Sequence, residues 1–121
     1  MSTSIREEIY DDVAVLVVIG NLVAGPDVVV LHDHVKKLVG NGVIRVVVDF
    51  SAVSWFGSAM LGVLAASYST IVTAGGGVRL IGVTAKVAQI MDVTRLSDVF
   101  ETLPTLDVAM ASLRGCDPVE A

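Results

Sequence analysis

The sequence contains a single cysteine, Cys116, near its carboxyl end. One thiol permits neither an intrachain disulfide bond nor a metal cluster held by several cysteines, and this usage is typical of a reducing cytoplasm. Basic residues are also scarce, with 8 Lys and Arg against 13 Asp and Glu, and no basic cluster exceeds Lys36-Lys37. Because nucleic acids and anionic membranes are held mainly by clustered positive charge, we expect neither as a partner.

Residues 50–78 contain no charged side chain, a gap long enough to raise the question of a transmembrane helix. The gap includes several serines and threonines and the run Gly75-Gly76-Gly77, so no stretch of about 18 predominantly apolar residues survives. The first ten residues are polar and do not resemble a signal peptide. We therefore expect a buried helix in this gap, no membrane span and a cytoplasmic location.

The length of 121 residues fits one domain, and an apolar content of 54% excludes a disordered chain. Short valine-rich runs bounded by turn residues predict strands at residues 5–10, 13–19, 43–49, 78–82 and 98–101. Helical spacing and capping residues predict helices at residues 26–40, 58–73 and 84–91, and a last helix that opens at Thr102 or Thr105 and ends near Leu113. This alternation predicts a single small α/β domain with a mixed, mostly parallel sheet of four to five strands covered by about four helices.

The helices are expected to bury Val28, Leu31, Val35 and Leu38 in the first and Leu61, Leu64, Ala65, Tyr68 and Ile71 or Val72 in the second. The first should stop at Gly40 in a left-handed cap, and Gly75-Gly76-Gly77 should form a turn. Residues 50–57 are expected to connect the third strand to the second helix.

Residues that could carry catalysis are few. The two histidines, His32 and His34, are two positions apart on a predicted helix, so they point to different sides and are expected on a solvated face rather than in a metal site. No spacing supports a Ser-His-Asp or Cys-His arrangement. Gly57-Ser58 follows a predicted strand segment, but neither of the nucleotide-binding patterns G-x-G-x-x-G and G-K-[ST] surrounds it. We expect a protein that is not an enzyme and needs no cofactor or metal, with nucleotide binding near Gly57 as a minor alternative.

Ser58 is the residue best placed for a chemical role. It stands at the predicted amino end of a helix, where its hydroxyl can cap free backbone N–H groups. A phosphate at that position would be stabilised by the same N–H groups and by the helix dipole. The fold would therefore tolerate the phosphate, whereas its charge would weaken the binding of a partner that packs on the neighbouring Trp55, Phe56 and Met60. Ser58 is therefore either an ordinary cap or a phosphorylation switch.

The stretch from Ser51 to Leu64, SAVSWFGSAMLGVL, resembles the signature of the STAS domain family, the sulphate transporter and anti-sigma factor antagonist domains. Four other segments resemble family segments in the same order: residues 17–22, 43–49, 75–81 and 96–100. The resemblance covers nearly the whole chain, and we expect a STAS-like domain over residues 1–114 and a flexible tail over residues 115–121.

The resemblance implies an anti-sigma factor antagonist of bacterial partner switching, of the soluble type. Such a protein binds an anti-sigma factor that is also a serine kinase, is released when the serine matching Ser58 is phosphorylated, and is restored by a serine phosphatase. The partner-binding residues it implies are Asn21, Leu22, Trp55, Phe56, Gly57, Ser58, Ala59 and Met60. The chain itself is expected to be a monomer or a weak dimer.

Four positions depart from the family pattern. Gly57 and Val23 stand where relatives commonly carry acids, Ala59 replaces a Ser or Thr, and Met60 replaces a glycine. Two carboxylates are thus missing from the region expected to meet the kinase. The alternative function is a structural STAS subunit of a larger regulatory assembly, in which the serine is not regulated.

Overall fold

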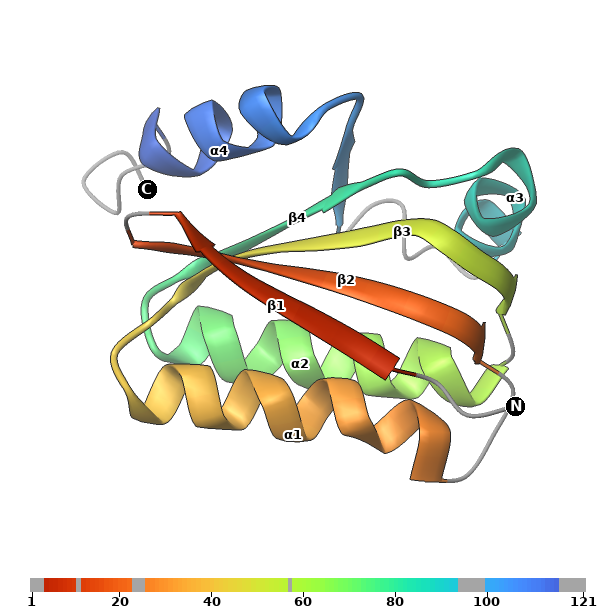
Figure 1. Cartoon of the computed structure of the whole chain (residues 1–121), viewed down its shortest axis with the longest axis horizontal. Coiled ribbons are helices and arrows are strands. Elements are labelled where there is room, and N and C mark those ends of the chain that lie inside the picture. The colour runs from red at the N-terminus through yellow and green to blue at the C-terminus, as the bar shows by residue number, and fades with distance from the viewer. Residues whose placement is uncertain (1–3, 11, 23–25, 57, 94–99, 116–121) are drawn as a thin grey trace.

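The computed structural model of the chain describes residues 4–10, 12–22, 26–56, 58–93 and 100–115 (Figure 1). Its elements in chain order are β1 (Ser4–Tyr10), β2 (Val13–Leu22), α1 (Pro26–Gly40), β3 (Arg45–Phe56), α2 (Ser58–Thr73), β4 (Gly77–Ile81), α3 (Ala85–Val93), β5 (Glu101–Leu103) and α4 (Leu106–Gly115). The strands form one sheet in the order β1-β2-β3-β4-β5, in which β1 is antiparallel to β2 and the other pairs are parallel. The predicted mixed α/β architecture is confirmed.

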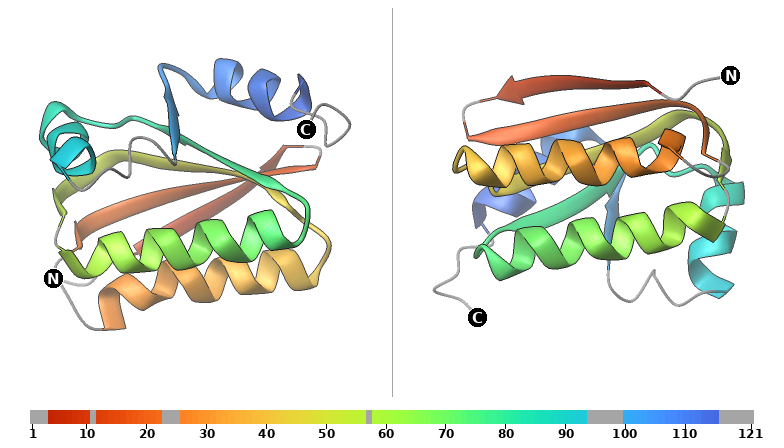
Figure 2. Two further views of the ribbon diagram at one scale, coloured as in Figure 1. Left: turned by 180° about the vertical axis from the view of Figure 1, so that it is seen from behind. Right: turned by 90° about the horizontal axis from the view of Figure 1, so that it is seen from below.

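The helices cover both faces of the sheet. α1 and α2 lie side by side along one face, and α4 lies over the other (Figures 1 and 2). Side chains of β2 alternate between the two layers, because successive residues of a strand point to opposite faces. Leu16 and Val18 pack in the core beneath α1 and α2, whereas Val15 and Val17 join the smaller core beneath α4. The prediction of a strand buried on both faces is confirmed for residues 13–18.

Two strands are longer than the sequence predicts. β2 continues past Gly20 to Leu22, and β3 continues through residues 50–56, where a connection was expected. The reason is their pairing: after register shifts, β2 and β3 remain partners up to Leu22 and Phe56. Backbone groups that a loop would leave to water are paired within the sheet instead. Within the uncharged residues 50–78, the described ones thus form the end of β3, the whole of α2, the turn after it and the start of β4. Among the described residues, no helix is long and apolar enough to cross a membrane.

The last strand lies later in the chain than predicted. β5 comprises Glu101–Leu103 rather than 98–101, of which 98 and 99 lie outside the described residues. Its register places Glu101 opposite Arg79, and the Arg79 Nε lies 3.1 Å from the carboxylate. α4 then opens at Thr105, whose Oγ1 accepts a hydrogen bond of 3.2 Å from the N–H of Val108. Of the two predicted start positions, Thr105 is confirmed.

The buried sides of the two long helices largely match their spacing. In α1, Leu31, Val35 and Leu38 are buried as predicted, whereas the side chain of Val28 lies outside the described set. In α2, Leu64 and Ile71 are buried, but Ala65 and Val72 are exposed. Of the alternatives Ile71 and Val72, Ile71 is therefore the buried one. Only Ala65 was predicted wrongly, because α2 turns the buried Ser67 inward and leaves Ala65 on its outer side.

Both long helices end in the same hydrogen-bonded cap. In α1, the N–H of Val43 donates to the carbonyl of Leu38 at 2.8 Å and that of Gly42 to Val39 at 3.0 Å. The left-handed residue of this cap is Gly42, with φ of 85°, so the assignment to Gly40 was wrong. Gly75, with φ of 92°, occupies the same place after α2 and confirms the predicted turn. Such a cap satisfies carbonyl groups that the helix end leaves free.

The two glycines at the end of α1 provide a matched test of this cap. We expect Gly42→Ala to destabilise the protein by about 1 to 2 kcal/mol, because a Cβ disfavours the left-handed conformation. Gly40→Ala should be neutral or stabilise by up to about 1 kcal/mol, because Gly40 lies within the helix and a Cβ there meets no other atom. Urea denaturation of the two variants measures the difference, and equal stabilities would contradict the assignment.

Candidate functional site

The candidate site lies where β2 and β3 end and α2 begins. In the parallel register, Asn21 is the partner of Trp55 and Leu22 is the partner of Phe56. Neighbouring strands are about 4.8 Å apart, so residues far apart in the sequence meet at one edge of the sheet. The structure therefore brings together the backbones of four predicted site residues. Gly57, the fifth, lies outside the described residues.

The remaining predicted residues form the first turn of α2. The helix begins at Ser58, followed by Ala59 and Met60, only two positions after the end of β3. The carboxyl ends of parallel strands are the edge at which α/β sheets commonly bind ligands and partners. This arrangement gives one continuous backbone surface from β2 across β3 to the start of α2.

The electrostatics of this edge follow from the composition of α2. The helix has no acidic residue in its first turn and no basic residue in its last turn. The partial positive charge at the amino end of a helix, about half an elementary charge, is thus not offset by an acid of α2 itself. An anionic group attached at Ser58 would meet free N–H groups and a favourable dipole.

A tight contact, which the sequence analysis did not single out, holds β3 upstream of this edge. The Asp49 Oδ1 accepts a hydrogen bond of 2.8 Å from the backbone N–H of Ser51. Gly82, which follows β4 with φ of +66°, packs so closely that a Cβ there would overlap Asp49 Oδ1 and lie 2.7 Å from the nitrogen of Ser51. The glycine at the end of the predicted strand 78–82 was the available sequence signal, because a glycine in a strand permits a close backbone approach.

A small open pocket of about 330 Å³ lies at the same edge of the sheet, beside the ends of β4 and β5. Among the described residues it is lined by Gly82, Val83, Ala88, Thr102, Leu103 and Pro104, none of which is charged.

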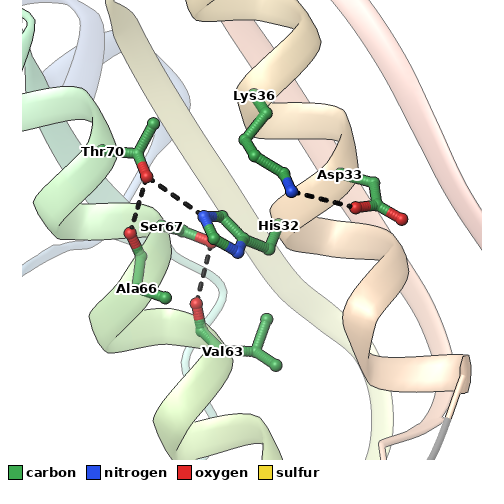
Figure 3. Close-up of polar contacts among 7 residues, drawn as sticks. All are labelled: His32, Asp33, Lys36, Val63, Ala66, Ser67 and Thr70. Carbon is green, nitrogen blue, oxygen red and sulfur yellow. Dashed lines mark hydrogen bonds and ion pairs between the residues drawn. The ribbon is translucent and has the colours of Figure 1, made fainter.

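The two histidines point to different neighbours, as their spacing predicted, and each is partly rather than fully exposed. His32 reaches from α1 to α2, where its Nε2 lies 3.0 Å from the Thr70 Oγ1 (Figure 3). The Thr70 hydroxyl donates its one proton to the carbonyl of Ala66 at 3.0 Å, so His32 must be the donor to Thr70. His34 instead lies 3.0 Å from the carboxylate of Glu7 on β1. Within the described part of the chain, no group of three or more potential metal ligands is found.

Ser67 is the other polar side chain between the two helices. It is 5% exposed, and its hydroxyl donates to the carbonyl of Val63 at 2.8 Å (Figure 3). Its one proton is therefore used within α2, and it serves packing rather than chemistry.

Comparisons with known proteins give the following matches. The model of one protein family, described as STAS domain, matches residues 4–109. An anti-sigma factor antagonist from Mycobacterium paratuberculosis is 27% identical, with a TM-score of 0.81, over 93% of this chain and 95% of that one. A candidate anti-sigma factor antagonist from Thermotoga maritima is 24% identical, with a TM-score of 0.78, over 91% and 94%. SpoIIAA of Bacillus in its phosphorylated form is 14% identical, with a TM-score of 0.70, over 89% and 97%. No curated protein sequence matches the chain.

The hydrogen bonds between α1 and α2 can be tested through Thr70. We expect Thr70→Val to lower the free energy of unfolding by about 1 kcal/mol, because the half-buried Nε2–H of His32 loses its acceptor. Thr70→Ser keeps the hydroxyl, so its free energy of unfolding should stay within about 0.5 kcal/mol of that of the unmodified protein. Chemical denaturation measures both, and a loss in Thr70→Ser without a loss in Thr70→Val would mean that the methyl group, rather than the hydroxyl, matters.

Proposed function

Because the chain belongs to the STAS domain family, we propose that it is an anti-sigma factor antagonist of bacterial partner switching. In its unphosphorylated form it binds an anti-sigma factor with serine kinase activity, and phosphorylation of Ser58 releases it. A serine phosphatase returns it to the binding form. The protein acts by binding and not as an enzyme, and it works in the cytoplasm. The Mycobacterium paratuberculosis antagonist, similar over nearly the full length of both chains, supports this proposal.

The observation that carries the proposal is the position of Ser58 at the start of α2, beside the paired ends of β2 and β3. A partner that covers Asn21, Leu22, Trp55 and Phe56 would also cover the first turn of α2. A single modification of Ser58 would then act at the interface itself.

The physical basis of release is the added charge. A phosphate carries about −1.5 to −2 charges at neutral pH. At the amino end of α2 it is stabilised within the free protein by about 0.3 to 1 kcal/mol. In the complex, the same charge would lie within the interface with the partner and would have to lose its water. Phosphorylation therefore leaves the fold intact and opposes binding. The phosphorylated form of SpoIIAA from Bacillus, which shares the fold, is consistent with a fold that accepts a phosphate.

The phosphorylation site can be located directly. We expect incubation with the anti-sigma factor kinase of the same organism and ATP to place one phosphate on Ser58, read by mass spectrometry. Ser58→Ala should abolish it, whereas Ser69→Ala should not, because Ser69 is an exposed serine farther along the same helix. Phosphate on another residue would show that Ser58 is only a helix cap.

The role of charge in release can be separated from that of the cap. Ser58→Asp should weaken partner binding about tenfold, which corresponds to about 1.4 kcal/mol. Ser58→Asn is the matched control, because Asn caps a helix as well as Asp does but brings no charge. Titration calorimetry with the anti-sigma factor measures both affinities. Similar losses in the two variants would point to size or lost capping rather than charge.

A second function is favoured by one observation, the absence of an acid from the first turn of α2. The chain would then be a structural STAS subunit of a larger regulatory assembly, with Ser58 as an unregulated cap. A complex that persists on size-exclusion chromatography in the presence of kinase and ATP, together with no phosphate on Ser58, would identify this function.

A further inference from the structure

β1 is an edge strand with an unusual side-chain pattern. No other strand of the described residues pairs with its outer edge, and Figure 2 shows it at the margin of the sheet. Ile9 and Tyr10 are exposed to 49% and 40%, which is high for large apolar side chains. An uncovered edge with free N–H and C=O groups can pair with another strand.

The two faces of β1 carry different groups. Ile5, Glu7 and Ile9 face the layer of α1 and α2, as shown by the packing of Ile5 in that core and by the Glu7–His34 contact at 3.0 Å. On the other face, Glu8 accepts a hydrogen bond of 2.7 Å from the Tyr10 hydroxyl and lies 3.1 Å from the Arg6 Nε. The hydrogen bond to Glu8, with the negative charge of that residue, raises the pKa of Tyr10.

This pattern is complementary to itself. We propose that two copies of the chain pair antiparallel through β1, about a two-fold axis at Glu7, and form one continuous ten-stranded sheet. In this register Arg6 of each copy lies opposite Glu8 of the other, and Ile5 lies opposite Ile9. Two cross-strand ion pairs form on one face and two apolar pairs on the other. Each kind of pair stabilises adjacent strands.

Other registers are disfavoured. An axis between two residues would set side chains from opposite faces against each other, because directly opposed residues of an antiparallel pair share a face. An axis at Arg6 sets Arg6 against its own copy and Ile5 against Glu7. An axis at Glu8 sets Glu8 against its own copy and Ile9 against Glu7. With the axis at Glu7, only Glu7 faces a like charge, and each carboxylate is held by its own His34.

The helical layer accommodates the second copy. α1 contacts both β1 and β2, so it lies over the space between them. With strands about 4.8 Å apart, the α1 helices of the two copies would be about 10 Å apart. This is within the range at which helices pack. The two copies would therefore meet through a layer of strands and a layer of helices.

A charge exchange tests this pairing in the full chain. We expect sedimentation velocity to show concentration-dependent dimerisation, which Arg6→Glu and Glu8→Arg each weaken about tenfold or more. The double variant Arg6→Glu/Glu8→Arg should restore it, because both cross-strand pairs re-form with their signs exchanged. Lys36→Glu is the control for Arg6→Glu, since it makes the same charge change at an exposed residue about 200° around α1 from His34, the side chain that contacts β1. Circular dichroism verifies folding. A monomer at all concentrations, or a double variant as weak as the single ones, would overturn the proposal.

The register is tested separately by disulfide trapping. In a Cys116→Ser background, Glu7→Cys should oxidise to a covalent dimer, because opposed Cα atoms of an antiparallel pair are about 4.5 to 5.5 Å apart and within disulfide range. Ile5→Cys should not, because residue 5 lies four positions away from its own copy. Equal trapping of both variants would contradict the register. Neither experiment involves Ser58, so the proposed dimerisation and the proposed partner switch are tested independently of each other.

Discussion

The parallel pairing of β2 with β3 is the interaction on which the rest of the structure depends. These two strands form the centre of the sheet, and their pairing runs from Val13 and Arg45 to Leu22 and Phe56. β3 pairs with β4 only as far as Asp49, so the last residues of β3 are held in the sheet by β2. The position at which α2 begins is set by where this pairing ends. Without it, residues 50–56 would be a loop and the start of α2 would have no fixed place beside β2.

The same pairing explains why the fold needs two layers of helices. Parallel strands joined by helices bury both faces, which accounts for the valine-rich runs of β2 and β3. α1 and α2 connect successive parallel strands and therefore lie on one face, as expected from right-handed crossovers. The opposite face is left to α4, which is fixed through Arg79: its Nε donates to the Ser112 hydroxyl at 2.8 Å and lies 3.1 Å from Glu101. One central arginine thus ties β4, β5 and α4 together. The candidate site and the β1 edge are two margins of this one sheet.

Much of the fold was predictable because its signals are local. Helix starts at Thr84 and Thr105, the buried positions Leu31 and Val35, and the glycine turn before β4 are each encoded within a few residues. The errors have a common origin. The extension of β3, the place of β5 and the inward turn of Ser67 all depend on which distant residue lies opposite. The left-handed residue is Gly42 rather than Gly40 because α1 remains helical through Gly40 and the chain turns towards β3 only after it.

For the site, the sequence by itself determined the chemistry that is present: a serine at a helix start, apolar neighbours and no acid in the first turn of α2. It also determined the family, because several short motifs occur in the right order. Only the tertiary structure decided that Asn21 and Leu22 lie beside Trp55 and Phe56, and that β1 presents a free edge with a self-complementary row of charges. The physical reason is that composition and capping act within one turn or strand, whereas strand register is fixed jointly by partners far apart in the chain.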